Sequence, residues 1–190
     1  MGAGPQPNYH EYDVCRTLWI IDTQGPIGRH LLRKEVELTE CSVRTILKKL
    51  MSLAYIESRP QGQSITEAGK AYLLSLPYFA QARFLEAGDL SLGAYDYAIV
   101  TNSDASCLTN AIAQRDEAIK IGGDGATILI FRKGRLVMPP EFLDPYEAYP
   151  DDITRLLDTL ALSEGDIVVI GSGPSKRLAQ LAAMAAFDAL

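Results

Sequence analysis

Apolar residues recur every three or four positions through much of the first eighty residues, which is the spacing of amphipathic helices. This pattern predicts helices over 13–22, 29–35 and 40–52, with Thr39 as the N-cap of the third. The stripe that would face a core is clearest in the third helix, where it consists of Val43, Ile46, Leu47 and Leu50.

Two short strand patterns follow this helix. Residues 55–59 and 63–65 are expected to pair across the turn Pro60-Gln61-Gly62, and Thr66 caps a further helix that ends before Pro77. Three helices, a hairpin and a fourth helix form the order of a winged helix-turn-helix. We therefore expect such a domain over residues 9–78.

The segment from His30 to Leu73 resembles the winged-helix regulators of the MarR and PadR type. The resemblance rests on Leu47-Lys48-Lys49-Leu50, on the hairpin 55–65 and on Thr66-Glu67-Ala68-Gly69. It implies that residues 40–52 form the recognition helix of a DNA-binding transcriptional regulator.

A recognition helix enters the major groove, where hydroxyl and guanidinium groups reach base edges and lysines contact phosphates. The alternative interpretation is that this is only the solvated face of a helix in a protein-interaction module. The predicted base-edge residues are Ser42, Arg44 and Thr45, the predicted phosphate contacts are Lys48 and Lys49, and Arg59 is placed near the tip of the wing.

The second half has a different pattern, in which short apolar runs alternate with helical stretches. After a connector at 79–92, this pattern predicts a small α/β domain over 93–190 with a mixed sheet, so that the chain is a two-domain α/β protein. Strands are expected at 94–101, 126–131, 135–139 and 166–170, a loop at 140–150, and helices at 111–121, from Asp151 or Asp152 to 162, and at 175–189.

The loops after the first and last of these strands carry the candidate ligand site. If the two strands run parallel, loops 101–104 and 171–176 open at the same edge of the sheet. Glycines before a helix N-terminus favour an anion, although the spacing fits neither the P-loop nor the dinucleotide fingerprint, and the alternative is a simple glycine turn. The predicted ligand-binding residues are Thr101, Asn102 and Ser103 in one loop and Ser172, Gly173, Ser175 and Lys176 in the other.

Residues 86–190 are also similar to an archaeal domain of unknown function that is found fused to winged helices. The similarity rests on RDEAIKIGGDGATILIFRKGRLVMP at 115–139 and on the GSGPSK unit at 171–176. It implies a regulator of archaeal type and brings no known ligand.

The net charge of −6 does not exclude DNA binding, because residues 1–80 hold nine basic and eight acidic side chains and the acidity lies in the second half. Cys15, Cys41 and Cys107 form no CxxC pair, and with two histidines we expect no metal site, no cofactor and a reducing cytoplasm. We also expect no secretory signal and no membrane span, since no apolar run reaches about 18 residues.

The leading hypothesis is a cytoplasmic DNA-binding regulator that has no catalytic activity and acts as a homodimer through helix 13–22 or helix 175–189. Its second domain would sense a small anionic or polar metabolite. The alternatives are an enzyme for an anionic metabolite with a regulatory winged helix, and a scaffold whose winged helix binds protein.

Overall fold

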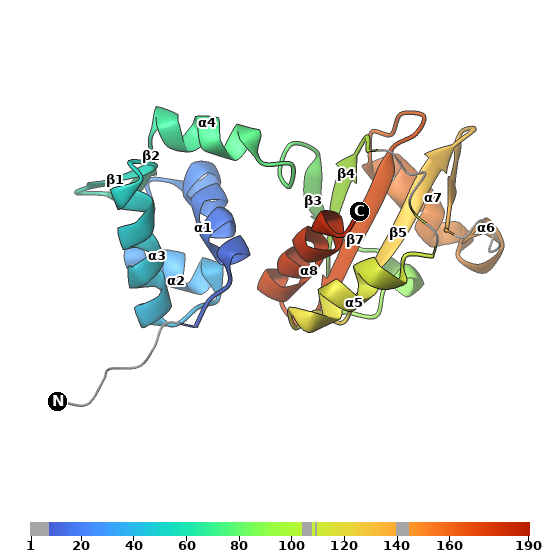
Figure 1. The fold of residues 1–190 in the computed structure, drawn as a ribbon, viewed down its shortest axis with the longest axis horizontal. Coiled ribbons are helices and arrows are strands. Elements are labelled where there is room, and N and C mark those ends of the chain that lie inside the picture. Colours follow the sequence, from blue (N-terminus) through green and yellow to red (C-terminus); the bar gives the residue numbers. More distant parts are fainter. Residues whose placement is uncertain (1–7, 104–107, 109, 140–144) are drawn as a thin grey trace. The chain divides into compact units, whose positions relative to one another are not determined.

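The computed structural model describes residues 8–103, 108, 110–139 and 145–190, and it divides the chain into two compact units. The first unit ends at Phe79 and the second runs from Ala80 to Leu190 (Figure 1). The two-domain α/β fold predicted from the sequence is confirmed.

The first unit has the predicted order of three helices, a hairpin and a fourth helix. Its cap residues are also as predicted, since the Thr39 hydroxyl accepts a hydrogen bond from the Ser42 amide and the Thr66 hydroxyl accepts one from the Gly69 amide. The elements are α1 (Glu11–Gln24), α2 (Arg29–Val36), α3 (Glu40–Ser52), β1 (Ile56–Arg59), β2 (Gly62–Ile65) and α4 (Glu67–Ser75).

A buried arginine joins α1 to the end of α2. Arg16 is 3% exposed, and its guanidinium donates to the carbonyl oxygens of Glu35 and Val36, each at 2.9 Å. The last carbonyls of a helix have no partner within the helix, so this side chain satisfies two of them from outside. The sequence analysis gave Arg16 no role.

The second unit is a five-stranded sheet in the order β3-β4-β7-β5-β6, covered on both faces. Figure 1 shows α5 and α8 on one face and α7 on the other. The elements are β3 (Ala82–Leu85), η1 (Gly88–Leu90), β4 (Tyr95–Thr101), α5 (Ile112–Lys120), β5 (Gly125–Arg132), β6 (Arg135–Val137), α6 (Pro145–Ala148), α7 (Pro150–Thr159), β7 (Ile167–Gly173) and α8 (Lys176–Asp188).

Three details of the second unit differ from the prediction. Each strand of the sheet runs antiparallel to its neighbour, so the sheet is not mixed. The expected connector 79–92 contains β3, which pairs with β4 at the edge of the sheet. The expected loop 140–150 contains α6, while residues 140–144 lie outside the described part.

The central strand β7 is buried along its whole length because helices cover both faces of the sheet. On the α7 side, Ile153 and Leu156 pack in one cluster with Ala98, Val168 and Ile170. On the other side, α8 presents a run of buried alanines to the sheet. None of the helices in the described residues is long and apolar enough to cross a membrane.

Replacing Arg16 with methionine tests the connection between α1 and α2. The variant keeps an apolar side chain of similar length but leaves two carbonyls at the end of α2 without their donor, one of them in a buried hydrogen bond. We expect a loss of about 3 kcal/mol in the free energy of unfolding, measured by urea denaturation. The control is R33M on the exposed side of α2, which should change it by no more than about 0.5 kcal/mol. Equal effects of the two substitutions would contradict the assigned role.

Candidate functional site

Helix α3 presents two basic side chains to solvent on one face. Arg44 and Lys48 are exposed and lie four residues apart, about one helical turn. Within the described part of the chain, neither takes part in an ion pair or side-chain hydrogen bond. Both residues are among the DNA contacts predicted from the sequence, which placed Lys48 on the polar face of this helix and Arg44 at its flank.

Ser42 is not on this face, and its predicted role as a base-edge contact is wrong. The residue is fully buried, and its hydroxyl donates to the Asn8 carbonyl oxygen at 3.0 Å and accepts from the Asn8 amide at 3.1 Å. It lies four residues before Ile46, so it shares the core-facing side of α3. Ser42 therefore holds the chain that leads into α1 and is not accessible to a nucleic acid.

Three further predicted DNA contacts are already engaged within the first unit. The Lys49 ammonium lies 2.6 Å from a carboxylate oxygen of Glu11 in α1, and this hydrogen bond raises the pKa of Lys49. Arg59 pairs with Glu57 on the same strand of the hairpin. The Thr45 hydroxyl donates to the Cys41 carbonyl oxygen at 3.0 Å.

Basic residues that are not among the predicted DNA contacts lie on α2. Arg33 and Lys34 are exposed in its last turn, and Arg29 at its start is 3.8 Å from Glu40, the first residue of α3. Glu37, between the two helices, has a φ of 55°, and this left-handed residue turns the chain from α2 into α3. The sequence shows a mildly basic stretch over residues 29–59 that includes these positions, but it gave them no predicted DNA contact.

A small pocket of about 220 Å³ lies in the first unit among α1, α3 and α4. Burial raises the pKa of the Cys15 thiol and raises that of the neighbouring Tyr72 hydroxyl to about 12. Both groups are therefore neutral near pH 7, and a protonated thiol is a poor nucleophile. Across the described residues, no three His, Cys, Asp or Glu side chains gather as a metal site.

The ligand site predicted at loops 101–104 and 171–176 does not exist. Because β4 and β7 are antiparallel, Tyr95 is opposite Gly173 and Thr101 is opposite Ile167, so the two loops lie at opposite ends of the strands. At one end, the Thr101 and Ser103 hydroxyls are 3.1 Å apart, and the Asn102 amide donates to Asp166 at 3.0 Å. Asp104 of that loop lies outside the described residues.

At the other end, the glycines belong to β7 and not to a loop. Gly171, Ser172 and Gly173 are buried, and the Ser172 hydroxyl faces the Gly125 carbonyl oxygen at 3.4 Å. A Cβ on Gly171 would lie 2.1 Å from the Ala183 nitrogen, and one on Gly173 would lie 2.8 Å from the Ala179 nitrogen. The glycines therefore let α8 approach the strand, and ligand roles for Ser172 and Gly173 are wrong.

Ser175 and Lys176 begin α8 beyond the end of β7. The Ser175 hydroxyl caps the helix by accepting a hydrogen bond from the Leu178 amide at 3.3 Å. Lys176 is exposed, with its ammonium 5.7 Å from the centre of the Phe84 ring. The sequence predicts seven ligand-binding residues. Of these, Lys176 is the one that lines any of three pockets found among the described residues.

Adding a methyl group to the glycines of β7 tests the close approach of α8. We expect G173A to lower the free energy of unfolding by about 2 kcal/mol, because the new Cβ collides with backbone atoms that move only with the whole helix. G171A should have a larger effect, since its Cβ would lie closer still to α8. G28A is the control, because its Cβ would have no atom within 4 Å. Thermal unfolding measures all three, and an unchanged melting temperature for G173A would contradict this account.

Comparison with known proteins identifies both parts of the chain. Residues 12–71 match the PH0730-like N-terminal domain, and residues 92–190 match the domain of unknown function DUF4443. The hypothetical protein PH0730 from Pyrococcus horikoshii OT3 has a solved structure that is similar to this chain, with 30% sequence identity and a TM-score of 0.72. The similarity covers 95% of this chain and 92% of PH0730. No curated protein matches. The chain therefore belongs to the PH0730-like family, and its second unit is a DUF4443 domain.

Proposed function

We propose that the first unit binds double-stranded DNA through the exposed face of α3 and that the chain is a transcriptional regulator. The observation that carries this proposal is the pair Arg44 and Lys48, which are exposed on one face of the second helix of a helix-turn-helix. Neither has an acidic partner among the residues that the structure describes. Arginine can bond bidentately to guanine in the major groove, while lysine neutralises a phosphate.

The surroundings of α3 support the same function. The hairpin β1–β2 follows α3 directly and occupies the place of a wing, with Arg59 at the end of β1 next to the turn. Arg33 and Lys34 add exposed positive charge on the preceding helix. Exposed cations such as Arg33 and Lys34 would supply electrostatic affinity that depends on salt and not on sequence.

We further propose that the regulator acts as a homodimer without catalytic activity. A single unit offers only a few phosphate contacts, and two units on two half-sites would add their contacts on one duplex. The His10 imidazole serves as the N-cap of α1 by accepting a hydrogen bond from the Tyr12 amide, and Cys15 is a half-buried thiol with a raised pKa. Neither arrangement resembles an activated nucleophile.

Removing charge from α3 tests DNA binding directly. We expect K48A to weaken binding to a duplex of mixed sequence and to reduce the slope of log K against log salt by about 0.9, the value for one lost phosphate contact. R44A should reduce the preference for a selected site by about 1–3 kcal/mol if the guanidinium reads a base. Fluorescence anisotropy measures both, with K70A on α4 as the matched control. The interface is wrong if K70A weakens binding as much as K48A does.

The ion pair between Glu11 and Lys49 gives a second test, in which the substitution is expected to strengthen DNA binding. E11Q removes the negative charge that holds the Lys49 ammonium, so the lysine is held less firmly and can contact phosphate. We expect E11Q to bind DNA several-fold more tightly at low salt, by an amount comparable to about 1 kcal/mol. The control is E67Q, which breaks an equivalent exposed pair with Lys70 on α4. Unchanged or weaker binding by E11Q would show that Lys49 lies outside the interface.

A further inference from the structure

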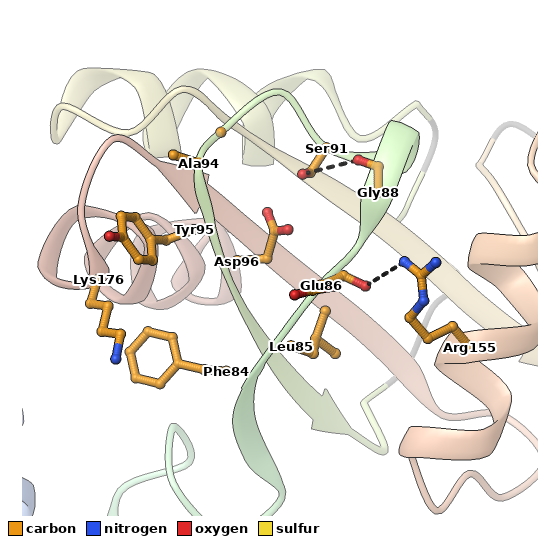
Figure 2. Close-up of a pocket in the computed structure, with 11 residues that line it drawn as sticks. Phe84, Leu85, Glu86, Gly88, Ser91, Ala94, Tyr95, Asp96, Arg155 and Lys176 are labelled. Atoms are coloured by element: carbon orange, nitrogen blue, oxygen red, sulfur yellow. Dashed lines mark hydrogen bonds between the residues drawn. The ribbon is translucent and has the colours of Figure 1, made fainter.

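The residues around a pocket of about 440 Å³ in the second unit belong to two faces of the sheet (Figure 2). Asp96 lies between Tyr95 and Tyr97 along β4, so its side chain points to the opposite face from theirs. The Oδ1 atom of Asp96 is buried and has no hydrogen-bond partner among the described residues. A ligand that contacts Tyr95 therefore cannot also bond to this oxygen.

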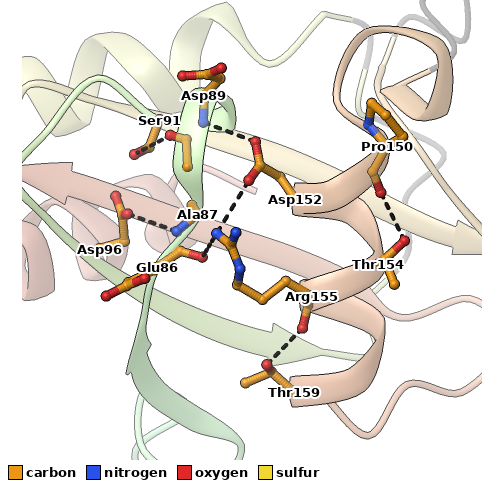
Figure 3. A network of polar contacts seen from close by, with 11 residues as sticks. Glu86, Ala87, Asp89, Ser91, Asp96, Pro150, Asp152, Thr154, Arg155 and Thr159 are labelled. Carbon is orange, nitrogen blue, oxygen red and sulfur yellow. Dashed lines mark hydrogen bonds and ion pairs between the residues drawn. The ribbon is translucent and has the colours of Figure 1, made fainter.

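On the α7 face, side chains that border this pocket hold parts of the fold together (Figure 3). The Arg155 guanidinium contacts the Asp152 carboxylate at 3.2 Å and the Glu86 carbonyl oxygen at 3.4 Å. Asp152 in turn accepts a hydrogen bond from the Asp89 amide at 3.0 Å. These bonds tie α7 to the segment between β3 and β4, and we assign this pocket no ligand.

The outer face of α5 combines two exposed isoleucines with two opposite charges. Ile112 and Ile119 are 48% and 49% exposed, and they lie on one side of the helix because they are seven residues, or about two turns, apart. Between them are Arg115 and Asp116, whose side chains are about half exposed and pair with each other at 3.1 Å. The opposite side of the helix, which contains Ala118, is buried in the unit.

These four residues are arranged symmetrically along α5. The isoleucines lie at equal distances from the midpoint between Arg115 and Asp116, where a basic residue adjoins an acidic one. When a second copy of α5 lies antiparallel about a twofold axis at this midpoint, Ile112 meets Ile119 of that copy. Arg115 likewise meets Asp116 of the second copy, and each contact occurs twice. The face is therefore complementary in charge to a second copy of itself.

Helix α8, which lies beside α5 on the same face of the sheet, has no comparable surface (Figure 1). Its residues from Ala179 to Ala186 are all buried. Gly171 and Gly173 bring the backbone of α8 against β7, so the alanines are covered within the unit. These alanines are not available to a second copy of the chain.

We propose that the homodimer forms through α5, packed antiparallel against α5 of a second copy about an axis between Arg115 and Asp116. This interface rests on the homodimer proposed above, for which it supplies the contact surface, and it does not need DNA. Each Arg115 pairs with Asp116 of both copies, so four alternating charges form a network, which contributes more than an isolated surface pair. Ile112 and Ile119 are removed from water on both copies.

The small size of this contact sets the expected affinity. Because α5 has nine residues, two copies bury less than the roughly 1,200 Å² at which interfaces of stable complexes begin. We therefore expect a weak dimer in solution, with a dissociation constant of about 10–100 µM. Two copies on adjacent half-sites of one duplex would associate more readily, because the DNA raises their effective concentration.

Sedimentation velocity of the full chain without DNA, at about 1–500 µM, tests this interface. R115D and D116R each place four like charges around the axis, so each variant alone should dimerise at least about tenfold more weakly than the natural chain. An equimolar mixture of the two places acidic residues of one chain opposite basic residues of the other. The mixture should form a heterodimer at least as tight as the natural dimer, and an ion pair that acts only within one chain would give no such recovery.

I119E tests the apolar contact and should weaken the dimer at least about tenfold. Its matched control is L74E, at an exposed leucine of α4, which should dimerise as the natural chain does. K48A should also dimerise normally, so that loss of DNA binding and loss of the dimer are separate outcomes. The interface is overturned if the natural chain stays monomeric at about 500 µM, if R115D and D116R do not associate, or if I119E dimerises as L74E does. In the last case a homodimer exists, but α5 is not its interface.

Discussion

The close approach of α8 to β7 is the constraint on which the second unit depends. Because Gly171 and Gly173 have no Cβ, the backbone of α8 can pack directly against β7. The small alanine side chains of α8 allow an equally short distance between helix and sheet along the rest of the contact. A strand so closely covered must sit in the middle of the sheet, where β4 and β5 flank it on either side. The glycines are thus a packing requirement, and β4 and β5 both pair with the strand that contains them.

Local features of the fold could be predicted from the sequence because they depend on neighbouring residues. The caps at Thr39 and Thr66, the hairpin between β1 and β2, and the span of α3 are fixed by residues a few positions apart. Strand direction, in contrast, is not determined by neighbouring residues alone. Whether β4 and β7 run parallel depends on how the intervening chain crosses the sheet, and short apolar runs are equally compatible with both. The prediction that loops 101–104 and 171–176 open at the same edge of the sheet was wrong because it assumed that these strands are parallel.

In the candidate sites, too, some features depend on neighbouring residues and others depend on how distant segments pack. Spacing along α3 predicted a polar face that contains Lys48, with Arg44 at its flank, and both side chains are exposed. The same spacing contained the signal that Ser42 is buried, since Ser42 lies one turn before Ile46. The Glu11–Lys49 ion pair joins residues 38 positions apart, so only the packing of α1 on α3 reveals it. The pocket around Asp96 likewise depends on β3, whose four residues lacked a strand pattern strong enough to predict.

The choice of arginine at position 16 has a consequence for how the first unit responds to acidity. A guanidinium keeps its proton at every pH a cell experiences, whereas a buried histidine or lysine in the same place would change its charge. The two hydrogen bonds from Arg16 to the end of α2 therefore keep their charged donor when a cell becomes acidic, so this connection between α1 and α2 is not lost by a change in the protonation of its donor.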